Sequence, residues 1–326
     1  MSIKTYAMAI RDTLAAEMRR DDRVFCMGED IETAGGSFGC TRDLYKEFGV
    51  ERVRNTPISE AGFVGAGVGA ANAGMRPVVE LMYWDFAYVA MDQILNQAAK
   101  IRYMFGGKAK VPLVIRGQQG IGKGNAAQHS QCPEVFFMHM PGLKVAMPSC
   151  AEDAAGLLRT AIRDDNPVAF IEHKALYFIK GEVNDDPDFM IPFGQAKIKR
   201  EGSDVTVVGT HLFVGRSLEA ADIVEKEGIS CEVIDPRTIV PFDYDTVIES
   251  VKKTGRLVIA HEAYKTAGMG AQIAAYVQEH AFNYLDAPIQ IVGAMHCPIP
   301  FNANLENTVI ASVDDIAAAI RKTMYK

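Results

Sequence analysis

Residues 55–74 read NTPISEAGFVGAGVGAANAG and place one carboxylate, Glu60, directly before a run of Gly, Ala and Val residues. Pro57 biases the residue before it toward extended geometry, so we expect a strand that ends near Thr56 and a helix that begins near Glu60. Small residues recur along that helix and leave its backbone open to close approach by another helix. The stretch therefore predicts either a buried functional acid at a subunit interface or a first-turn glutamate that favours the helix dipole.

The composition describes a globular chain with two domains. Its 326 residues exceed the size of one ordinary core, and 48% of them are hydrophobic and 23% charged. The net charge of −7, without a basic block, argues against a nucleic-acid partner. Because no apolar run is long enough to span a bilayer and the first residues do not resemble a signal peptide, we expect no membrane association and a cytoplasmic location. The six cysteines lack C-x-x-C spacing and are expected to be reduced.

Strand and helix patterns alternate along both halves of the chain. In the first half, the pattern predicts a long helix over residues 85–105, followed by a strand over residues 111–115. The strands of the second half are expected at residues 205–209, 231–234, 257–260 and 289–293. Strands that alternate with helices in this way are typical of α/β domains with parallel sheets.

A change of composition divides the chain. Residues 174–193 lose the regular pattern and become rich in acids and prolines, which is typical of an exposed connection between domains. We therefore predict two parallel-sheet α/β domains, at residues 1–185 and 196–326, with a linker over residues 186–195.

Several common sites of chemistry are absent from the sequence. The glycines of residues 65–70 nearly match the dinucleotide fingerprint G-x-G-x-x-G/A, but they lie inside the expected helix rather than at its start, which argues against a nicotinamide cofactor. There is no phosphate-binding G-x-x-x-x-G-K-[ST] and no H-E-x-x-H. Residues 35–39, GGSFG, match the letters of G-x-S-x-G, but they lie in an expected glycine-rich loop and not at the strand-to-helix elbow that a nucleophilic serine needs. His129, in the glycine-rich loop RGQQGIGKGNAAQHSQ, and His261 each follow an expected strand end, where either a functional or a packing role is open.

The chain resembles one family of enzymes over essentially its whole length. The resemblance rests on TPISEAGF, on the run ELMYWDF…DQ…NQAAK…RYMFGG, and on AAQHSQ, PGLKV and AIRDDNPV. These motifs are similar to those of the beta subunit of the thiamine-diphosphate-dependent first component of 2-oxo acid dehydrogenase complexes. The resemblance implies a pyrimidine-binding domain at residues 1–185 and a transketolase-like carboxyl-terminal domain at residues 196–326.

The resemblance also implies roles for individual residues. In this family, the glutamate that matches Glu60 activates thiamine diphosphate by a hydrogen bond to its pyrimidine ring, and the histidine that matches His129 orients the 2-oxo substrate and aids acyl transfer to a lipoyl group. The positions that match other cofactor contacts are Glu29, Ile58, Met82 and Phe86. The positions that match a structural potassium site of some members are Leu113, Ala161, Ile162, Asp164 and Asn166.

Half of the expected cofactor site is missing from this chain. Thiamine enzymes anchor magnesium and the diphosphate through a G-D-G…N segment, and the sequence contains no G-D-G. An alpha subunit is therefore expected to supply that half, in an α2β2 heterotetramer that passes acyl groups to a lipoyl-bearing acyltransferase core. The expected substrate is pyruvate. Acetoin stays open because RYMFGGKA resembles the acetoin enzymes, and a branched-chain 2-oxo acid stays open because HEAYKTAG, around His261, resembles that type.

Other classes of function fit the sequence less well. A free-standing transketolase-like enzyme would need a phosphate anchor that the sequence lacks. A nicotinamide-dependent oxidoreductase would need its glycines at the start of a helix. A scaffold without activity is compatible with α/β domains, but it would leave the combination of Glu60, Phe86 and His129 unexplained.

Overall fold

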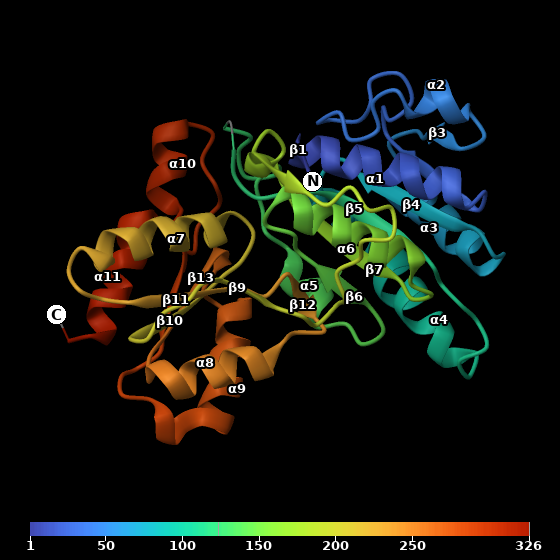
Figure 1. Ribbon diagram of the computed structural model, residues 1–326. Helices are drawn as coiled ribbons and strands as arrows, with labels where there is room; N and C mark the ends of the chain where they lie inside the picture. The colour runs from blue at the N-terminus through green and yellow to red at the C-terminus, as the bar shows by residue number, and fades with distance from the viewer. Residues whose placement is uncertain (123, 326) are drawn as a thin grey trace. The chain divides into compact units, whose positions relative to one another are not determined.

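The chain forms two compact units in the computed structural model, which describes residues 1–122 and 124–325 (Figure 1). Unit 1 comprises Met1–Gln119 and Phe136–Phe193, and unit 2 comprises Gly120–Val135 and Gly194–Lys326. Each unit is built on a largely parallel sheet, which confirms the α/β fold class predicted from the alternation of strands and helices. The loop Gly120–Val135, which the sequence pattern did not separate from the first domain, contributes to unit 2.

The sheet of unit 1 brings three functional segments to one edge. Its strands are β2 (Val24–Gly28), β3 (Val53–Asn55), β4 (Arg76–Leu81), β5 (Val114–Gln119), β6 (Lys144–Ala146) and β7 (Val168–His173). They are parallel and run in the order β6-β7-β5-β4-β2-β3. Gly28, the last residue of β2, aligns with Asn55 of β3 and Glu80 of β4. The carboxyl ends of these three neighbouring strands therefore lie together.

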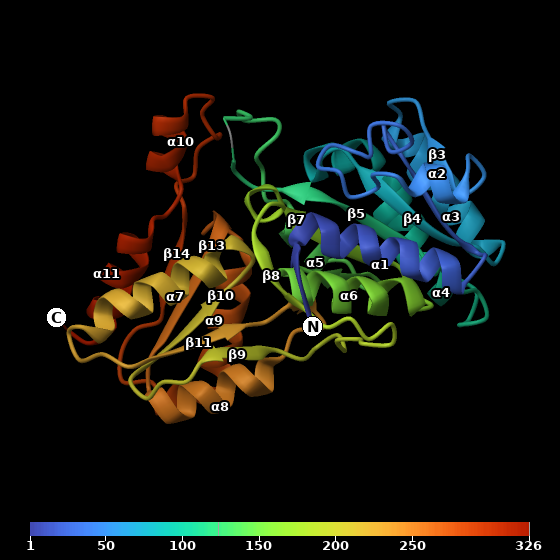
Figure 2. The same cartoon turned by 45° about the horizontal axis from the view of Figure 1, so that its top comes forward.

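Helices cover both faces of this sheet. α1 (Tyr6–Arg20) and α6 (Ala151–Arg163) lie side by side on one face (Figures 1 and 2), where Cys26 of β2 contacts Met18 of α1. α3 (Glu60–Asn72) lies on the opposite face, where a Cβ atom added at Gly67 would come within 2.8 Å of the Val79 side chain. Glycine at this position thus lets the helix backbone approach β4 closely.

The remaining segments of unit 1 are short. They are β1 (Ser2–Thr5), which pairs antiparallel with β8 (Lys180–Val183), α2 (Leu44–Phe48), α5 (Glu134–Met138) and a 3-10 turn at Lys174–Leu176. The prediction of one uniform helix over residues 85–105 is wrong. A 3-10 helix (Trp84–Ala90), a π-helical segment (Asp92–Ala98) and α4 (Ala99–Met104) follow one another there.

Unit 2 is a second α/β layer structure. Its elements are β9 (Lys197–Arg200), β10 (Val205–Gly209), α7 (Leu212–Glu225), β11 (Cys231–Asp235), β12 (Thr238–Val240), α8 (Tyr244–Thr254), β13 (Leu257–Tyr264), α9 (Met269–Ala281), a 3-10 turn (Phe282–Tyr284), β14 (Gln290–Ala294), α10 (Ala303–Val309) and α11 (Val313–Thr323). The sheet order is β14-β13-β10-β11-β9, with only the edge strand β9 antiparallel among the described residues.

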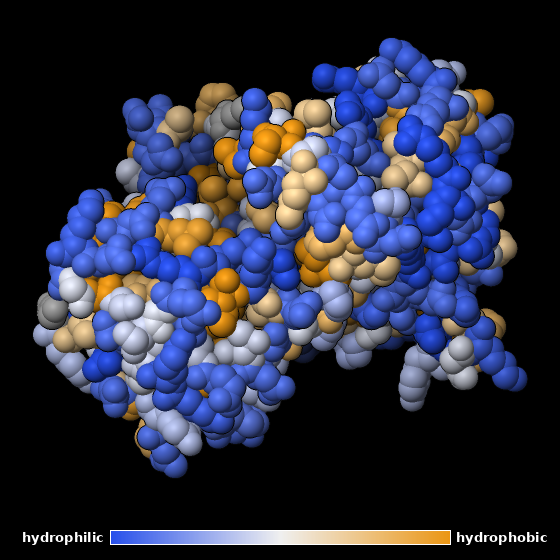
Figure 3. All heavy atoms as spheres, viewed as in Figure 1, coloured by the Kyte–Doolittle hydropathy of each residue, from blue (hydrophilic) through white to orange (hydrophobic). Residues whose placement is uncertain are grey.

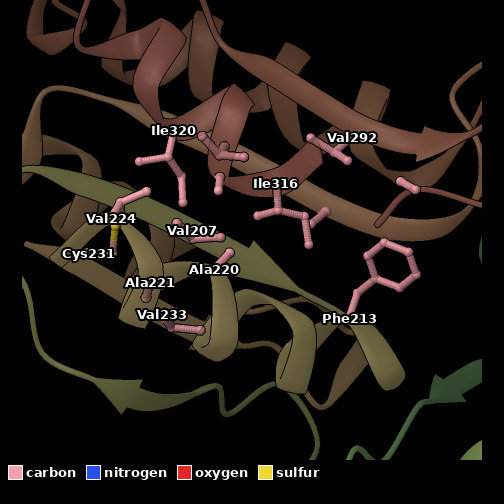
Figure 4. Packing of buried hydrophobic residues seen from close by; sticks show 14 of the residues in the cluster. Val207, Phe213, Ala220, Ala221, Val224, Cys231, Val233, Val292, Ile316 and Ile320 are labelled. Atoms are coloured by element: carbon pink, nitrogen blue, oxygen red, sulfur yellow. The ribbon is translucent and has the colours of Figure 1, made fainter. Parts of the chain in front are cut away.

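The core of unit 2 lies between one face of this sheet and helices α7 and α11 (Figure 4). Val207 and Val233 of the sheet, Phe213 of α7 and Ile316 of α11 belong to this core, and all four are fully buried. On the other face, Thr206 of β10 hydrogen-bonds the hydroxyl groups of α8. Helices thus cover both faces of this sheet, and successive residues of its strands are buried on opposite faces.

On the face drawn in Figure 3, hydrophilic side chains cover most of the surface and apolar ones emerge in separate groups. Within residues 1–122 and 124–325, no helix has both the length and the apolar character needed to cross a bilayer.

Candidate active site

Glu60 is the first residue of α3, as the sequence predicts. β3 ends at Asn55, and the main-chain N–H of Thr56 donates to the carbonyl of Gly28 at 2.9 Å, which ties the turn to the end of β2. The side chain of Glu60 is only 5% exposed. A carboxylate is thus held at the start of a helix, where the helix dipole favours negative charge, and at the ligand-binding edge of a parallel sheet.

Glu29 places a second buried carboxylate at this edge. It follows Gly28 directly, is 7% exposed, and its Oε1 atom has no hydrogen-bond partner among the described residues. Burial raises the pKa of Glu29 to about 7, and the negative charge of Glu60 adds to the increase. Two carboxyl groups that interact in this way, one with an unpaired buried oxygen, are suited to receive a polar ligand between them.

Three less polar residues occupy the same ends of β3 and β4. Ile58 lies two residues before Glu60 and is 83% exposed. Met82 follows the last residue of β4 and Phe86 lies in the 3-10 helix after it, and both are half-buried. The structure therefore gathers the candidate residues of unit 1 on three adjacent strand ends, where a flat apolar ring and polar groups could be held together.

His129 belongs to unit 2 and is described within that unit. It is half-buried in the loop Gly120–Val135, and its main-chain N–H donates to the carbonyl of Ala126 at 3.3 Å. The ends of the loop are joined because the N–H of Gly120 donates to the carbonyl of Gln131 at 3.1 Å. His129 thus lies on a closed loop rather than on a free segment.

A buried charge network near the unit 1 edge was not found by sequence reasoning. The Arg116 guanidinium, 1% exposed, donates to the carboxylates of Glu80 and Glu172, and Tyr177 donates to Glu172 at 2.5 Å. Burial raises the pKa of Glu80, while the charge of Arg116 opposes that increase. A Cβ atom added at Gly36 would meet the Glu80 carboxylate at 2.4 Å, so the network also supports the loop after β2. The available signal was a charged residue inside an apolar strand.

The residues proposed for potassium also come from one region. They are Leu113 before β5, Ala161 and Ile162 near the end of α6, and Asp164 and Asn166 in the turn to β7. Arg76 donates to the main-chain oxygens of Ile162 and Asp164, at 2.9 and 3.0 Å, and Arg102 donates to the Asn166 side chain at 2.9 Å. A potassium ion would have to use the remaining lone pairs of oxygens that already bind these guanidinium groups.

Among residues 1–122 and 124–325, no group of three or more His, Cys, Asp or Glu side chains is arranged to hold a metal ion. An organic cofactor fits the site better than a metal ion does. The Glu29 oxygen without a hydrogen-bond partner and the neighbouring Glu60 carboxyl group could both bind polar atoms of a ring.

Comparison with known families divides the chain in a similar way. The family "Transketolase, pyrimidine binding domain" matches residues 3–180, and the family "Transketolase, C-terminal domain" matches residues 194–316. A solved structure titled "Split gene transketolase, inactive beta4 tetramer" has a TM-score of 0.80 over 98% of both chains. Its sequence identity of 23% shows a shared fold alone.

Curated relatives are more similar in sequence. The pyruvate dehydrogenase E1 component subunit beta of Rickettsia felis is 51% identical over 323 residues, which cover 98% of each chain. The acetoin:2,6-dichlorophenolindophenol oxidoreductase subunit beta of Cupriavidus necator is 49% identical and covers 99% of this chain and 97% of its own. These similarities over nearly the full length show that the chain belongs to the family of beta subunits of thiamine-diphosphate-dependent 2-oxo acid dehydrogenases.

Proposed function

We propose that this chain is the beta subunit of a pyruvate dehydrogenase that decarboxylates pyruvate and passes the acetyl group to a lipoyl group on an acyltransferase core. The observation that carries the proposal is the buried pair Glu29 and Glu60 at adjacent strand ends, in a chain 51% identical to a named pyruvate dehydrogenase beta subunit. We also propose that residues 1–185 bind the cofactor's pyrimidine and that residues 196–326 form the transketolase-like domain.

Each candidate residue has a distinct task toward the cofactor. Thiamine diphosphate, when bound, supplies a carbon nucleophile for addition to the 2-oxo group. The carboxyl group of Glu60 would hold a ring nitrogen of the pyrimidine by a hydrogen bond, and Phe86 would pack against the same ring. The residues that would line the rest of the pyrimidine site are Glu29, Ile58 and Met82. His129 orients the 2-oxo acid and assists acyl transfer to the lipoyl group.

The other half of the site comes from an alpha subunit in this proposal. Support comes from the absence of a G-D-G segment in the sequence and from the lack of a carboxylate or histidine metal cluster among the described residues. The alpha subunit would therefore hold magnesium and the diphosphate. An α2β2 assembly would place the helix α3, with its small residues, against a partner subunit. Potassium would bind oxygen atoms of Leu113, Ala161, Ile162, Asp164 and Asn166.

Acetoin cleavage is the second candidate function. The relative from Cupriavidus necator favours it, since its identity of 49% is close to that of the pyruvate dehydrogenase subunits. A branched-chain 2-oxo acid dehydrogenase shares the proposed cofactor site, with the HEAYKTAG segment as its supporting feature.

The experiment is co-expression with the alpha subunit, followed by cofactor binding and substrate assays. We expect tight, magnesium-dependent thiamine diphosphate binding only by the mixture, and turnover of pyruvate in preference to acetoin. Tight cofactor binding by this chain alone would contradict the shared site. Preference for acetoin would replace the first candidate by the second.

Two substitutions test the residue roles. Glu60→Gln should leave assembly intact and lower turnover of every substrate by roughly 10²–10⁴-fold, the usual contribution of a positioned acid or base. Glu32→Gln, at a half-buried carboxylate in the loop after β2 and outside the proposed site, is the control. His129→Ala should spare cofactor binding and slow acyl transfer, with His139→Ala, at an exposed histidine, as its control. Retained activity in Glu60→Gln would remove Glu60 from the mechanism.

A further inference from the structure

Two buried carboxylates of unit 2 hold the loop that carries His129. Glu262, at the end of β13, is 6% exposed, and its Oε1 atom accepts a hydrogen bond from the N–H of Ile121. The same oxygen accepts from the thiol of Cys132 at 3.7 Å. Glu262 therefore contacts both ends of the loop, on either side of His129.

Glu306, in α10, holds a different part of the same loop. It is 4% exposed, and its two oxygens accept from the N–H groups of Gly122 and Gly124 at 3.2 and 3.3 Å. Among the described residues, no basic side chain pairs with Glu306. A buried carboxylate is thus balanced by loop N–H groups, and such charge-assisted hydrogen bonds are about twice as strong as neutral ones.

The glycines of the loop are required for this contact. Gly124 has φ of +64°, and a Cβ atom there would lie 2.7 Å from the carbonyl oxygen of Phe301, one residue before the cap of α10. Ile121, which follows the closing hydrogen bond of Gly120, is buried in the core of unit 2. The first half of the loop is therefore fixed on three sides, by the core, by Glu262 and by α10.

We propose that Glu262 and Glu306 are positioning residues that fix the described part of the loop, residues 120–122 and 124–132, and so set the place of His129. This inference rests on the proposed role of His129 in acyl transfer. It assigns neither carboxylate a contact with substrate. Because a displacement of about 1 Å at a reacting group can cost roughly 10²-fold in rate, loss of either carboxylate should affect the step that uses His129.

The test uses the complete enzyme, with this chain assembled with its alpha subunit, thiamine diphosphate and magnesium. The variants are Glu306→Ala, Glu306→Gln, Glu262→Gln and Gly124→Ala, with Glu279→Ala, at an exposed residue of α9, as the matched control. Amide hydrogen exchange of residues 120–132 reports the loop directly. Two partial reactions report the chemistry: decarboxylation with an artificial electron acceptor, and reductive acylation of a free lipoyl domain.

Glu306→Ala should speed amide exchange in the loop at least tenfold and lower kcat for lipoyl acylation roughly 10–100-fold, while the affinity for thiamine diphosphate stays within about twofold. Glu306→Gln keeps one acceptor oxygen and should fall between the wild type and Glu306→Ala. If Glu306→Ala fails to assemble, Gly124→Ala perturbs the same contact from the loop side and should give the same selective loss.

A double variant separates this proposal from the one on which it rests. In a His129→Ala background, Glu306→Ala should cause no further loss of lipoyl acylation, because it acts through His129. Additive losses would overturn the positioning role. Unchanged amide exchange of the loop in Glu306→Ala would show that Glu306 does not hold the loop. Full acyl transfer in His129→Ala alone would instead overturn the proposed function of His129, and the exchange measurement would still decide whether the carboxylates hold the loop.

Discussion

Glu29→Gln should remove a pH-dependent loss of stability from unit 1. Glutamine resembles the protonated acid, and the pKa of Glu29 is raised from 4.5 to about 7 in the folded protein by burial and by the charge of Glu60. The folded protein therefore binds more protons than the unfolded chain between these values. The stabilisation due to this group is fully present below pH 4.5 and is lost as the pH rises through about 7.

The size of the effect follows from the same shift. A difference of about 2.5 pK units corresponds to about 3.4 kcal/mol of unfolding free energy at full linkage, at 1.36 kcal/mol per unit. Glu29 retains some contact with solvent, which screens its charge, so we expect roughly half of this value. Glu29→Gln should match the wild type near pH 4.5 and exceed its unfolding free energy by about 1.5–2 kcal/mol at pH 8.

The single tryptophan makes the assay specific to unit 1. Trp84 is the only tryptophan in the sequence and is fully buried in that unit, so its fluorescence follows unfolding of unit 1 in urea. Unfolding of the cofactor-free chain would be measured at pH 5, 6, 7 and 8. Glu51→Gln, at a surface carboxylate that is 82% exposed, is the control. Parallel pH curves for the wild type and Glu29→Gln would refute the reasoning.

Three other perturbations test the packing and the potassium proposal. Arg116→Ala leaves the Glu80 and Glu172 carboxylates buried without their cation and should cost about 3–5 kcal/mol in the same fluorescence assay; a loss below about 1 kcal/mol would contradict the network. Gly142→Ala, where φ is +96° and a Cβ would meet the Ala99 carbonyl at 2.0 Å, should destabilise more than Gly106→Ala, which has open space; equal losses would contradict the clash. Replacing sodium chloride by potassium chloride at equal ionic strength should raise the melting temperature, because an ion that binds only the folded protein stabilises it. Identical melting temperatures in the two salts would contradict the proposed potassium site.

The sequence predicted the elements whose causes are local. Pro57 and the apolar run after Glu60 were sufficient to place the start of α3, which begins at Glu60. In unit 2, short apolar runs bounded by turn residues predicted strands such as β10 at its observed bounds, Val205–Gly209. The start of a helix and the bounds of a short buried strand depend on residues that are close together in the chain, so the local sequence pattern is enough to predict them.

The missed features depend on distant partners. The strand predicted over residues 111–115 is observed as β5, Val114–Gln119, because β5 pairs with the distant β7 as far as Gln119 opposite His173. Arg116 of this strand binds Glu172, 56 positions away. Glu262 lies 141 positions from Ile121, and Glu306 lies 184 positions from Gly122. No local pattern distinguishes such buried carboxylates from surface ones, since only the fold brings their partners near.

The irregular helix after β4 has a related cause. Its sequence has apolar spacing that suits one α-helix, yet the backbone changes from a 3-10 to a π-helical segment before α4 begins. Each change of helical type rotates the side chains that follow and so alters which residues, Phe86 among them, face a given direction. Packing needs of this kind override weak helix propensity.

The ribbon formed by β1 and β8 has a consequence for how this protein can be rearranged. Ser2 pairs with Val183 and Thr5 pairs with Lys180, so the first and last strands of unit 1 are neighbours. Chain ends that lie side by side in this way can be joined by a short connection. A short hairpin linker from Val183 to Ser2 would therefore keep β1 paired with β8 in a circular permutant of this chain, which gives protein engineering a place to move the chain ends.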